Sequence, residues 1–195
     1  RRRRGTSHRR APCLRRRPHA RGPMAGTHDL PQLGGGDSTS GVRIIRAGAA
    51  DVARLAPLFR AYLRFYGRTP GLSAPEEFLR ARLRSMDSLI FLAEIGGRAI
   101  GFAQLYPSFD SIELDKVLIL HDLFVEPDAR RRGVARGLME AVRQYGETVG
   151  ACGIGLATAI DNDGAQALYE QLGYVRDERF LHYFLTLSDG ARDVR

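Results

Sequence analysis

Near the middle of the chain, the apolar pattern changes from that of a strand to that of a helix. Residues 116–125 hold aliphatic and β-branched side chains that stop before Pro127, as in a buried strand. Apolar side chains then recur every three or four residues, which predicts a helix over 133–148. The side chains at this spacing are Val134, Leu138, Ala141, Val142, Tyr145 and Val149.

The segment before this strand predicts a first strand followed by two helices. Residues 42–46 have a strand pattern, and apolar side chains at helical spacing predict an amphipathic helix over 52–66. Ser73-x-x-Glu76 is a capping box that opens a second helix. Its inner face is expected to carry Phe78, Leu79, Leu83 and Met86.

The remaining elements are strands and one further helix. Gly96-Gly97 is a two-residue hairpin signal that joins strands over 89–95 and 99–106, and a polar connection is expected after them. We expect that connection over 107–115. A further strand is expected over 152–160, a helix over 163–172 and a final strand over 180–187. A length of 195 residues fits one domain and requires no second one.

Positive charge is concentrated at the N-terminus. Residues 1–23 contain ten of the 30 basic residues and no acidic one, so the rest of the chain carries a formal charge of −2. Residues 1–40 have no periodic apolar pattern, and we expect a disordered tail there, a domain over 41–188 and a short tail over 189–195. We interpret residues 1–23 as lying upstream of a true start at Met24. An organelle-targeting or RNA-binding arm is the alternative.

The cysteines and the hydropathy pattern indicate the compartment. Cys13 lies in the tail and Cys152 in an apolar run, with neither a sensible disulfide pairing nor metal-ligand spacing. Metal-free chemistry in a reducing compartment is therefore expected. No apolar segment approaches the 18 residues of a membrane span, and the tail lacks a secretory signal, so we expect a cytoplasmic protein without a membrane partner.

The loop between the central strand and helix predicts an anion site. Backbone N–H groups at the start of a helix have no acceptor within it, and the helix dipole favours negative charge there. Gly133 allows a ligand to approach the backbone closely, and Ala135 keeps the next position small. The segment is therefore predicted to bind a phosphate-bearing cofactor.

Two motifs resemble those of the GNAT superfamily of N-acetyltransferases. Arg130-x-x-Gly133-x-Ala135 is similar to its acyl-CoA signature. The second motif comprises Asn162, Ala165, Leu168, Tyr169, Leu172, Gly173 and Tyr174. The expected order of elements, β-α-α-β-β-β-α-β-α-β, matches the GNAT fold, an α/β fold with a mixed central sheet flanked by helices. Asp122-Leu-Phe-Val125 and the Phe/Tyr-rich end resemble the histone-acetyltransferase-like (Hpa-type) bacterial group.

The resemblance implies direct transfer of an acetyl group from acetyl-CoA, as co-substrate, to a primary amine, without a metal. Backbone groups of Leu123, Phe124 and Val125 would bind pantetheine. Arg131 is expected to face water, while Arg130 and Arg132 add charge. The remaining cofactor-binding positions are Gly133, Val134, Ala135 and Asn162, and Asn162 also has the position of a helix N-cap.

Catalytic and acceptor-side residues also follow from the resemblance. Tyr169 would be the general acid that protonates the thiolate, and its alternative is a packing tyrosine. His121 or Asp122 would be the base, although some family members pass the proton through water. The acceptor side is expected to involve Tyr62, Phe65 and Tyr66, whose alternative role is in the core stripe of their helix.

The sequence leaves the acceptor open between a small-molecule amine and an amine of a protein or peptide, and it leaves a homodimer open. A CoA-binding sensor without catalysis is the main alternative function. Nucleic-acid binding through the Arg-rich tail is the weaker one, because the rest of the chain is not basic.

Overall fold

The computed structural model describes residues 41–187. The chain divides into two compact units, residues 1–157 and 158–195, and each is described by itself. The tails predicted over 1–40 and 189–195 lie outside the described residues. Within 41–187, none of the helices has the length and apolar character needed to cross a bilayer.

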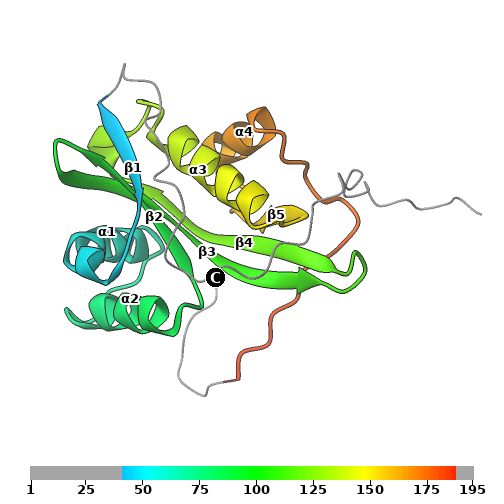
Figure 1. Cartoon of the computed structure of the whole chain (residues 1–195), viewed down its shortest axis with the longest axis horizontal. Coiled ribbons are helices and arrows are strands. Elements are labelled where there is room, and N and C mark those ends of the chain that lie inside the picture. Colours follow the sequence, from blue (N-terminus) through cyan, green and yellow to red (C-terminus); the bar gives the residue numbers. More distant parts are fainter. Residues whose placement is uncertain (1–40, 188–195) are drawn as a thin grey trace, which may run out of the picture. The chain divides into compact units, whose positions relative to one another are not determined.

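The first unit is built on a mixed sheet of five strands in the order β1-β2-β3-β4-β5. The first four strands pair antiparallel with their neighbours, and β5 runs parallel to β4 (Figure 1). The predicted mixed α/β fold is confirmed. The strands are β1 (Val42–Arg46), β2 (Leu89–Ile95), β3 (Arg98–Asp110), β4 (Asp115–Val125) and β5 (Gly153–Leu156).

Helices cover both faces of this sheet. α1 (Val52–Phe65) and α2 (Ala74–Ser85) pack on one face and α3 (Val134–Thr148) on the other (Figure 1). Neighbouring side chains of β2 show the two layers, because Leu92 belongs to the core under α1 whereas the Phe91 ring lies 6.2 Å from that of Tyr145 in α3. Short 3-10 turns, η1 (Ala49–Asp51) and η2 (Pro127–Ala129), precede α1 and follow β4.

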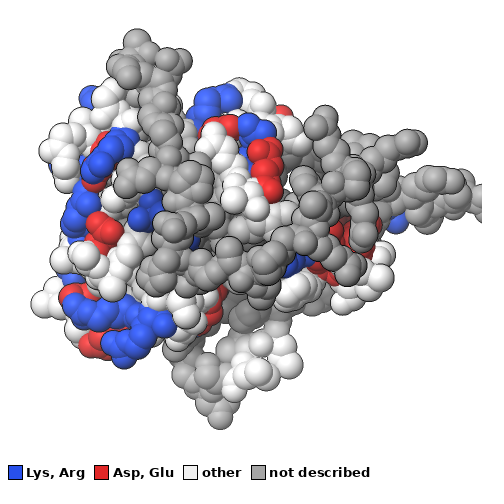
Figure 2. Space-filling view, in the orientation of Figure 1, with Lys and Arg blue, Asp and Glu red and all other residues white. Residues whose placement is uncertain are grey.

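Surface charges are arranged as mixed pairs. Arg98 lies 3.0 Å from Glu126 and 2.7 Å from Asp128, and Arg143 lies 2.8 Å from Glu147. On the face shown in Figure 2, basic and acidic side chains are interspersed over the described surface. Where described residues are visible on that face, basic side chains therefore have acidic neighbours.

The connection predicted over 107–115 is wrong, because most of it is strand. β3 and β4 pair as far as Asp110 and Asp115, and only residues 111–114 connect them. Pairing depends on backbone hydrogen bonds, which polar residues also make when a partner strand lies alongside. The strand predicted over 152–160 is shorter than expected, since β5 comprises only Gly153–Leu156.

Two details predicted for α2 are also wrong. The Ser73 side chain makes no capping hydrogen bond, and Glu76 instead pairs with Arg80 at 2.5 Å. Ser73 has helical backbone angles, whereas an N-cap residue needs an extended backbone to direct its oxygen at the helix. Met86 ends the helix with φ 52° and is 75% exposed, so it has left the inner face on which Leu79 is buried.

Over its described residues, 158–187, the second unit contains one helix, α4 (Asp163–Gln171). The side chain of Asn162 accepts a hydrogen bond from the amide of Ala165 at 3.3 Å, which confirms it as the N-cap. The strand predicted over 180–187 is wrong, because these residues have no regular structure and are all exposed. No strand within residues 41–187 pairs with this segment, and a strand is stable only when its backbone groups are paired.

Gly101 in β3 provides a test of the packing between β3 and β4. A Cβ atom at this position would lie 2.7 Å from the carbonyl oxygen of Phe124, so Gly101→Ala forces the backbone to move. We expect a loss of about 1–3 kcal/mol in the free energy of unfolding, measured by urea titration.

Gly153→Ala is the matched control, because this strand glycine has no atom within 4 Å of the added Cβ and no positive φ. Equal urea midpoints for the two variants would contradict the close approach of β3 and β4 at Gly101.

Candidate functional site

A β-bulge in β4 defines the site. Gln104 in β3 pairs with Asp122, but Leu105 pairs with Leu120, which leaves His121 as an extra residue on β4. Neighbouring side chains of a regular strand point to opposite faces. Here His121 and Asp122 line the same cavity. The bulge therefore presents two titratable side chains on one face of the sheet.

This cavity has a volume of about 630 Å³ and is lined by residues of α1, α2, β3 and β4 and by Arg68, which follows α1. Tyr62 and Tyr66, predicted on the acceptor side, contribute to its wall. Phe65, predicted with them, is not among its lining residues and is 60% exposed, with its ring 5.2 Å from that of Tyr66. Tyr62 and Tyr66 are four residues apart, so they lie one above the other on one helix face.

Asp122 lies where burial makes its charged form less stable than it is in water. Burial raises the pKa of its carboxyl group, and this effect exceeds the opposing influence of a hydrogen bond from Tyr62 and of the nearby His121. Burial and the negative charge of Asp122 in turn raise the pKa of the Tyr62 hydroxyl. Tyr62 therefore stays protonated and donates its hydrogen to the Asp122 carboxylate.

A second polar group, missed by the sequence reasoning, lies on the same face. Gln104 is fully buried, and its Nε2 donates to Ser88 Oγ at 2.9 Å and to Tyr106 Oη at 3.1 Å. Burial, with the negative charge of Asp122 next, raises the pKa of Tyr106 to about 12. The rings of Tyr106 and His121 lie 5.3 Å apart and nearly perpendicular. A glutamine in an otherwise apolar strand was the signal that could have identified this group.

The C-terminal end of β4 has an open edge. The parallel pairing with β5 ends at Leu120 and Leu156, and β4 continues to Val125 without a strand partner on that edge within residues 41–157. Leu123, Phe124 and Val125, the residues predicted to bind pantetheine, belong to this part of β4. Backbone groups at such an edge can pair with an extended ligand, as they would with an added strand.

The loop after β4 leads directly into α3. Arg131 and Gly133 have left-handed backbone conformations, with φ 59° and 79°, and Gly133 is the N-cap. The amide of Gly137 donates to the Gly133 carbonyl at 2.9 Å and closes the first turn of α3. The amides of Val134 and Ala135 therefore have no acceptor within α3 and can bind an anion.

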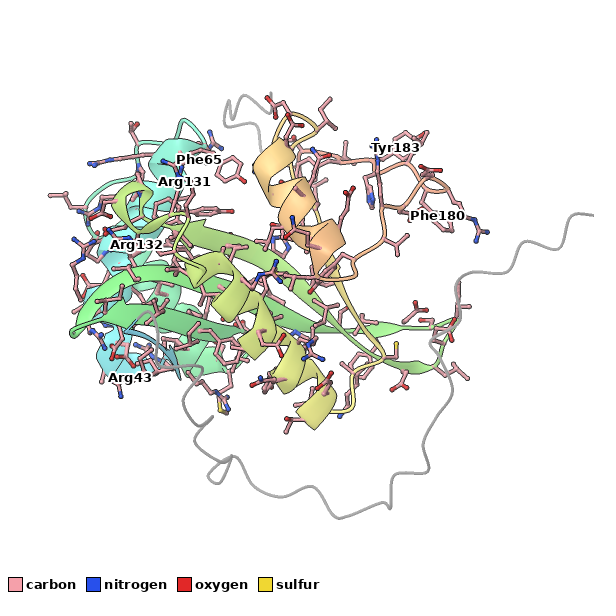
Figure 3. The ribbon with its side chains drawn as sticks, turned by 90° about the horizontal axis from the view of Figure 1, so that it is seen from above. Arg43, Phe65, Arg131, Arg132, Phe180 and Tyr183 are labelled. Carbon is pink, nitrogen blue, oxygen red and sulfur yellow. The ribbon has the colours of Figure 1, made fainter. Side chains whose placement is uncertain are left out.

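The three arginines of this loop differ in role. The Nε of Arg130 donates to the Val125 carbonyl at 3.1 Å, so this side chain joins the loop to the end of β4. Arg131 is exposed, as predicted, and Arg132 lies close enough to Asp128 to lower the pKa of its carboxyl group, although Arg98 has the larger effect. Figure 3 shows Arg131 and Arg132 on the loop that precedes α3.

Tyr169 and Asn162 belong to the second unit. The ring of Tyr169 lies 5.9 Å from that of Tyr174, and burial raises the pKa of Tyr174 to about 12. Asn162 is the N-cap of the helix that carries Tyr169. The catalytic role predicted for Tyr169 and the cofactor contact predicted for Asn162 stay predictions.

Comparison with known proteins gives consistent matches. A family model described as "Acetyltransferase (GNAT) family" matches residues 55–174. An uncharacterized N-acetyltransferase of Bacillus subtilis (strain 168), YhfO, is 42% identical over 146 residues, which cover 75% of this chain and 98% of the relative.

Two solved structures are also similar. The crystal structure of a probable acetyltransferase has a TM-score of 0.71 and 40% identity, covering 75% of this chain and 99% of the other. AAC(6')-Iy in complex with the bisubstrate analog CoA-S-monomethyl-acetylneamine has a TM-score of 0.65 and 25% identity, covering 74% of this chain and 98% of the other.

The raised pKa of Asp122 predicts how its replacement changes stability with pH. The folded protein holds this proton more tightly than the unfolded chain does. The protonated carboxyl group therefore contributes its full stabilisation below the ordinary carboxyl pKa, and this stabilisation decreases as pH rises through the raised pKa. Asp122→Asn cannot ionise but still offers an oxygen to Tyr62. We therefore expect its Tm at pH 7 to equal or exceed that of the wild type, with the difference narrowing toward pH 4.

Asp128→Asn is the control, because Arg98 lowers the pKa of Asp128 and the expected change in stability with pH is the reverse of that for Asp122. Its ionised form stabilises the fold above the ordinary carboxyl pKa, so this variant should lose a little Tm at pH 7 and less at low pH. Thermal unfolding from pH 4 to pH 8 measures both. A loss of Tm in Asp122→Asn that is largest at neutral pH would contradict a raised pKa.

Proposed function

The chain belongs to the acetyltransferase (GNAT) family and is an N-acetyltransferase, and we propose that it transfers an acetyl group from acetyl-CoA directly to a primary amine. One observation carries this proposal above the others. A single strand, β4, carries two titratable side chains into a cavity, continues as an open edge, and ends at a loop suited to bind phosphate.

Acetyl-CoA fits the open edge and the loop. Leu123, Phe124 and Val125 would bind the pantetheine arm through their backbone groups, and the first turn of α3 would bind the pyrophosphate. Arg132 would add positive charge beside that turn, and Arg131 would face water. The structure of AAC(6')-Iy supports this assignment, since that relative binds an analog that contains CoA.

Direct transfer requires the amine to lose a proton before it attacks. Its nitrogen then bonds to the carbonyl carbon of the thioester, the carbon–sulfur bond breaks, and the departing CoA thiolate takes up a proton. We assign the base role to Asp122, because a carboxylate of raised pKa accepts a proton more readily than an ordinary one. His121, which lines the same cavity, is the alternative base.

The remaining residues would position these groups. Tyr62 donates a hydrogen bond to Asp122 and so orients its carboxylate. Arg130 would hold the loop against the end of β4, which keeps the pyrophosphate site in register with the pantetheine edge. Tyr169 would protonate the thiolate, an assignment that rests on the resemblance of its motif.

Gly133→Glu tests the cofactor site. It puts bulk and negative charge at the start of α3, where the pyrophosphate would bind, and we expect the Kd for CoA to rise at least about tenfold by isothermal titration calorimetry. Gly150→Glu is the matched control, because Gly150 also has a positive φ and open space around it but lies after α3. Equal CoA affinity of the two variants would place the cofactor elsewhere.

Tyr169→Phe tests the general acid. Removing only the hydroxyl should lower kcat at least about tenfold, since general acid catalysis typically contributes 10²–10⁴-fold, while CoA affinity and Tm change little. Thiol release from acetyl-CoA in the presence of amines is the readout. A variant that loses stability but keeps its turnover per folded molecule would show that Tyr169 is a packing residue.

A further inference from the structure

The cavity beside Asp122 is walled mainly by aromatic rings. Phe59 and Phe78 stack with their centroids 5.4 Å apart and an interplanar angle of 7°, and Tyr62 and Tyr66 meet edge to face at 5.0 Å. Tyr106 closes the side formed by β3. Rings held by one another in this way form a rigid apolar surface that can accept a flat or bulky apolar group.

The cavity contains few charges. Among the described residues that line it, Asp122 is the only carboxylate and Arg68 the only Lys or Arg. One ammonium group can therefore pair with Asp122. Each further ammonium of a polycation would lie against apolar rings without a partner, or beside Arg68, and both arrangements oppose binding. The charges favour a ligand with a single cationic group.

Resting on the acetyl-transfer function proposed above, we propose that the acceptor is a small monoamine with an aromatic or other bulky apolar body, and neither a polyamine nor an aminoglycoside. The ammonium group binds at Asp122 and the apolar body lies among the rings of Phe59, Tyr62 and Phe78. A volume of about 630 Å³ is within the range of small-molecule sites.

The same arrangement accounts for each step of the transfer. The Asp122 carboxylate takes one proton from the ammonium group, and the free amine attacks the thioester carbonyl carbon of acetyl-CoA. As the carbon–sulfur bond breaks, the nitrogen loses its second proton and the thiolate takes one up, which leaves CoA and an N-acetylated amine, and Asp122 returns its proton to solvent. The product amide carries no charge and cannot form an ion pair with Asp122. It therefore binds more weakly than the amine, which favours its release.

A panel of amines tests this substrate class with the full-length protein. The panel contains 2-phenylethylamine, 1,4-diaminobutane, spermidine and kanamycin, and thiol release from acetyl-CoA gives kcat/KM for each. We expect kcat/KM for 2-phenylethylamine to exceed that for each polycation at least about tenfold. Calorimetric titration of the same amines in the presence of CoA measures their binding independently of turnover.

A charge reversal at Arg68 sharpens the test. Arg68→Glu adds a second carboxylate to the wall of the cavity, so it should raise kcat/KM for 1,4-diaminobutane relative to 2-phenylethylamine several-fold. Arg64→Glu is the matched control. It makes the same change of charge on the exposed surface of α1, at a residue that does not line the cavity. It should leave that ratio unchanged.

The outcomes separate the two proposals. A kcat/KM for spermidine or kanamycin equal to or above that for 2-phenylethylamine overturns the substrate class and leaves the acetyltransferase function standing. Absence of thiol release with every amine overturns the proposed function. In that case the calorimetry still decides on the cavity, since binding of 2-phenylethylamine no tighter than that of 1,4-diaminobutane overturns the monoamine assignment.

Discussion

The bulge at His121 changes which face of the sheet the side chains of β4 occupy. Before the bulge, Leu118 and Leu120 are buried, and the Leu118 side chain lies near α3 at Gly146. After it, Phe124 belongs to the core under α1. With regular alternation, residues 118, 120, 122 and 124 would all share one face. The extra residue shifts this alternation by one position, so Asp122 turns from the α3 layer to the cavity beside Tyr62.

Burying the Asp122 carboxylate lowers the stability of the fold, but it also makes the carboxylate a stronger base. A carboxylate in a cavity of aromatic rings is poorly solvated, which is why its pKa rises. The Tyr62 hydroxyl relieves part of that cost and orients the charge. Gln104 follows a related pattern, because it is fully buried and its Oε1 atom has no hydrogen-bond partner among the described residues. Polar groups held in such environments gather at functional sites, where a stronger base or a directed hydrogen bond is needed.

The sequence was informative where structure depends on local chemistry. The helix over 133–148, its glycine start and the hairpin at Gly96-Gly97 follow from residue types within short windows, and all three are present. The bulge was not predictable, because it is a property of the register between two strands rather than of either one. The length of β3 escaped prediction for the same reason, since β4 supplies the partners of its polar end. Residues 180–187 show the converse, because their sequence has a strand pattern but they pair with no strand in the described part of the chain.

The geometry of β4 also constrains where the reaction occurs. A strand rises about 3.3 Å per residue, so Asp122 and Val125 are about 10 Å apart along one rigid element. Arg130 ties the following loop to the carbonyl of Val125, which fixes the start of α3 relative to the same strand. A cofactor bound along Leu123–Val125 and anchored at Gly133 would therefore approach Asp122 in one direction only. In the proposed reaction the acceptor amine would meet the acetyl group at the bulge, because His121 and Asp122 line the cavity and follow the last residue of β4 that pairs with β5.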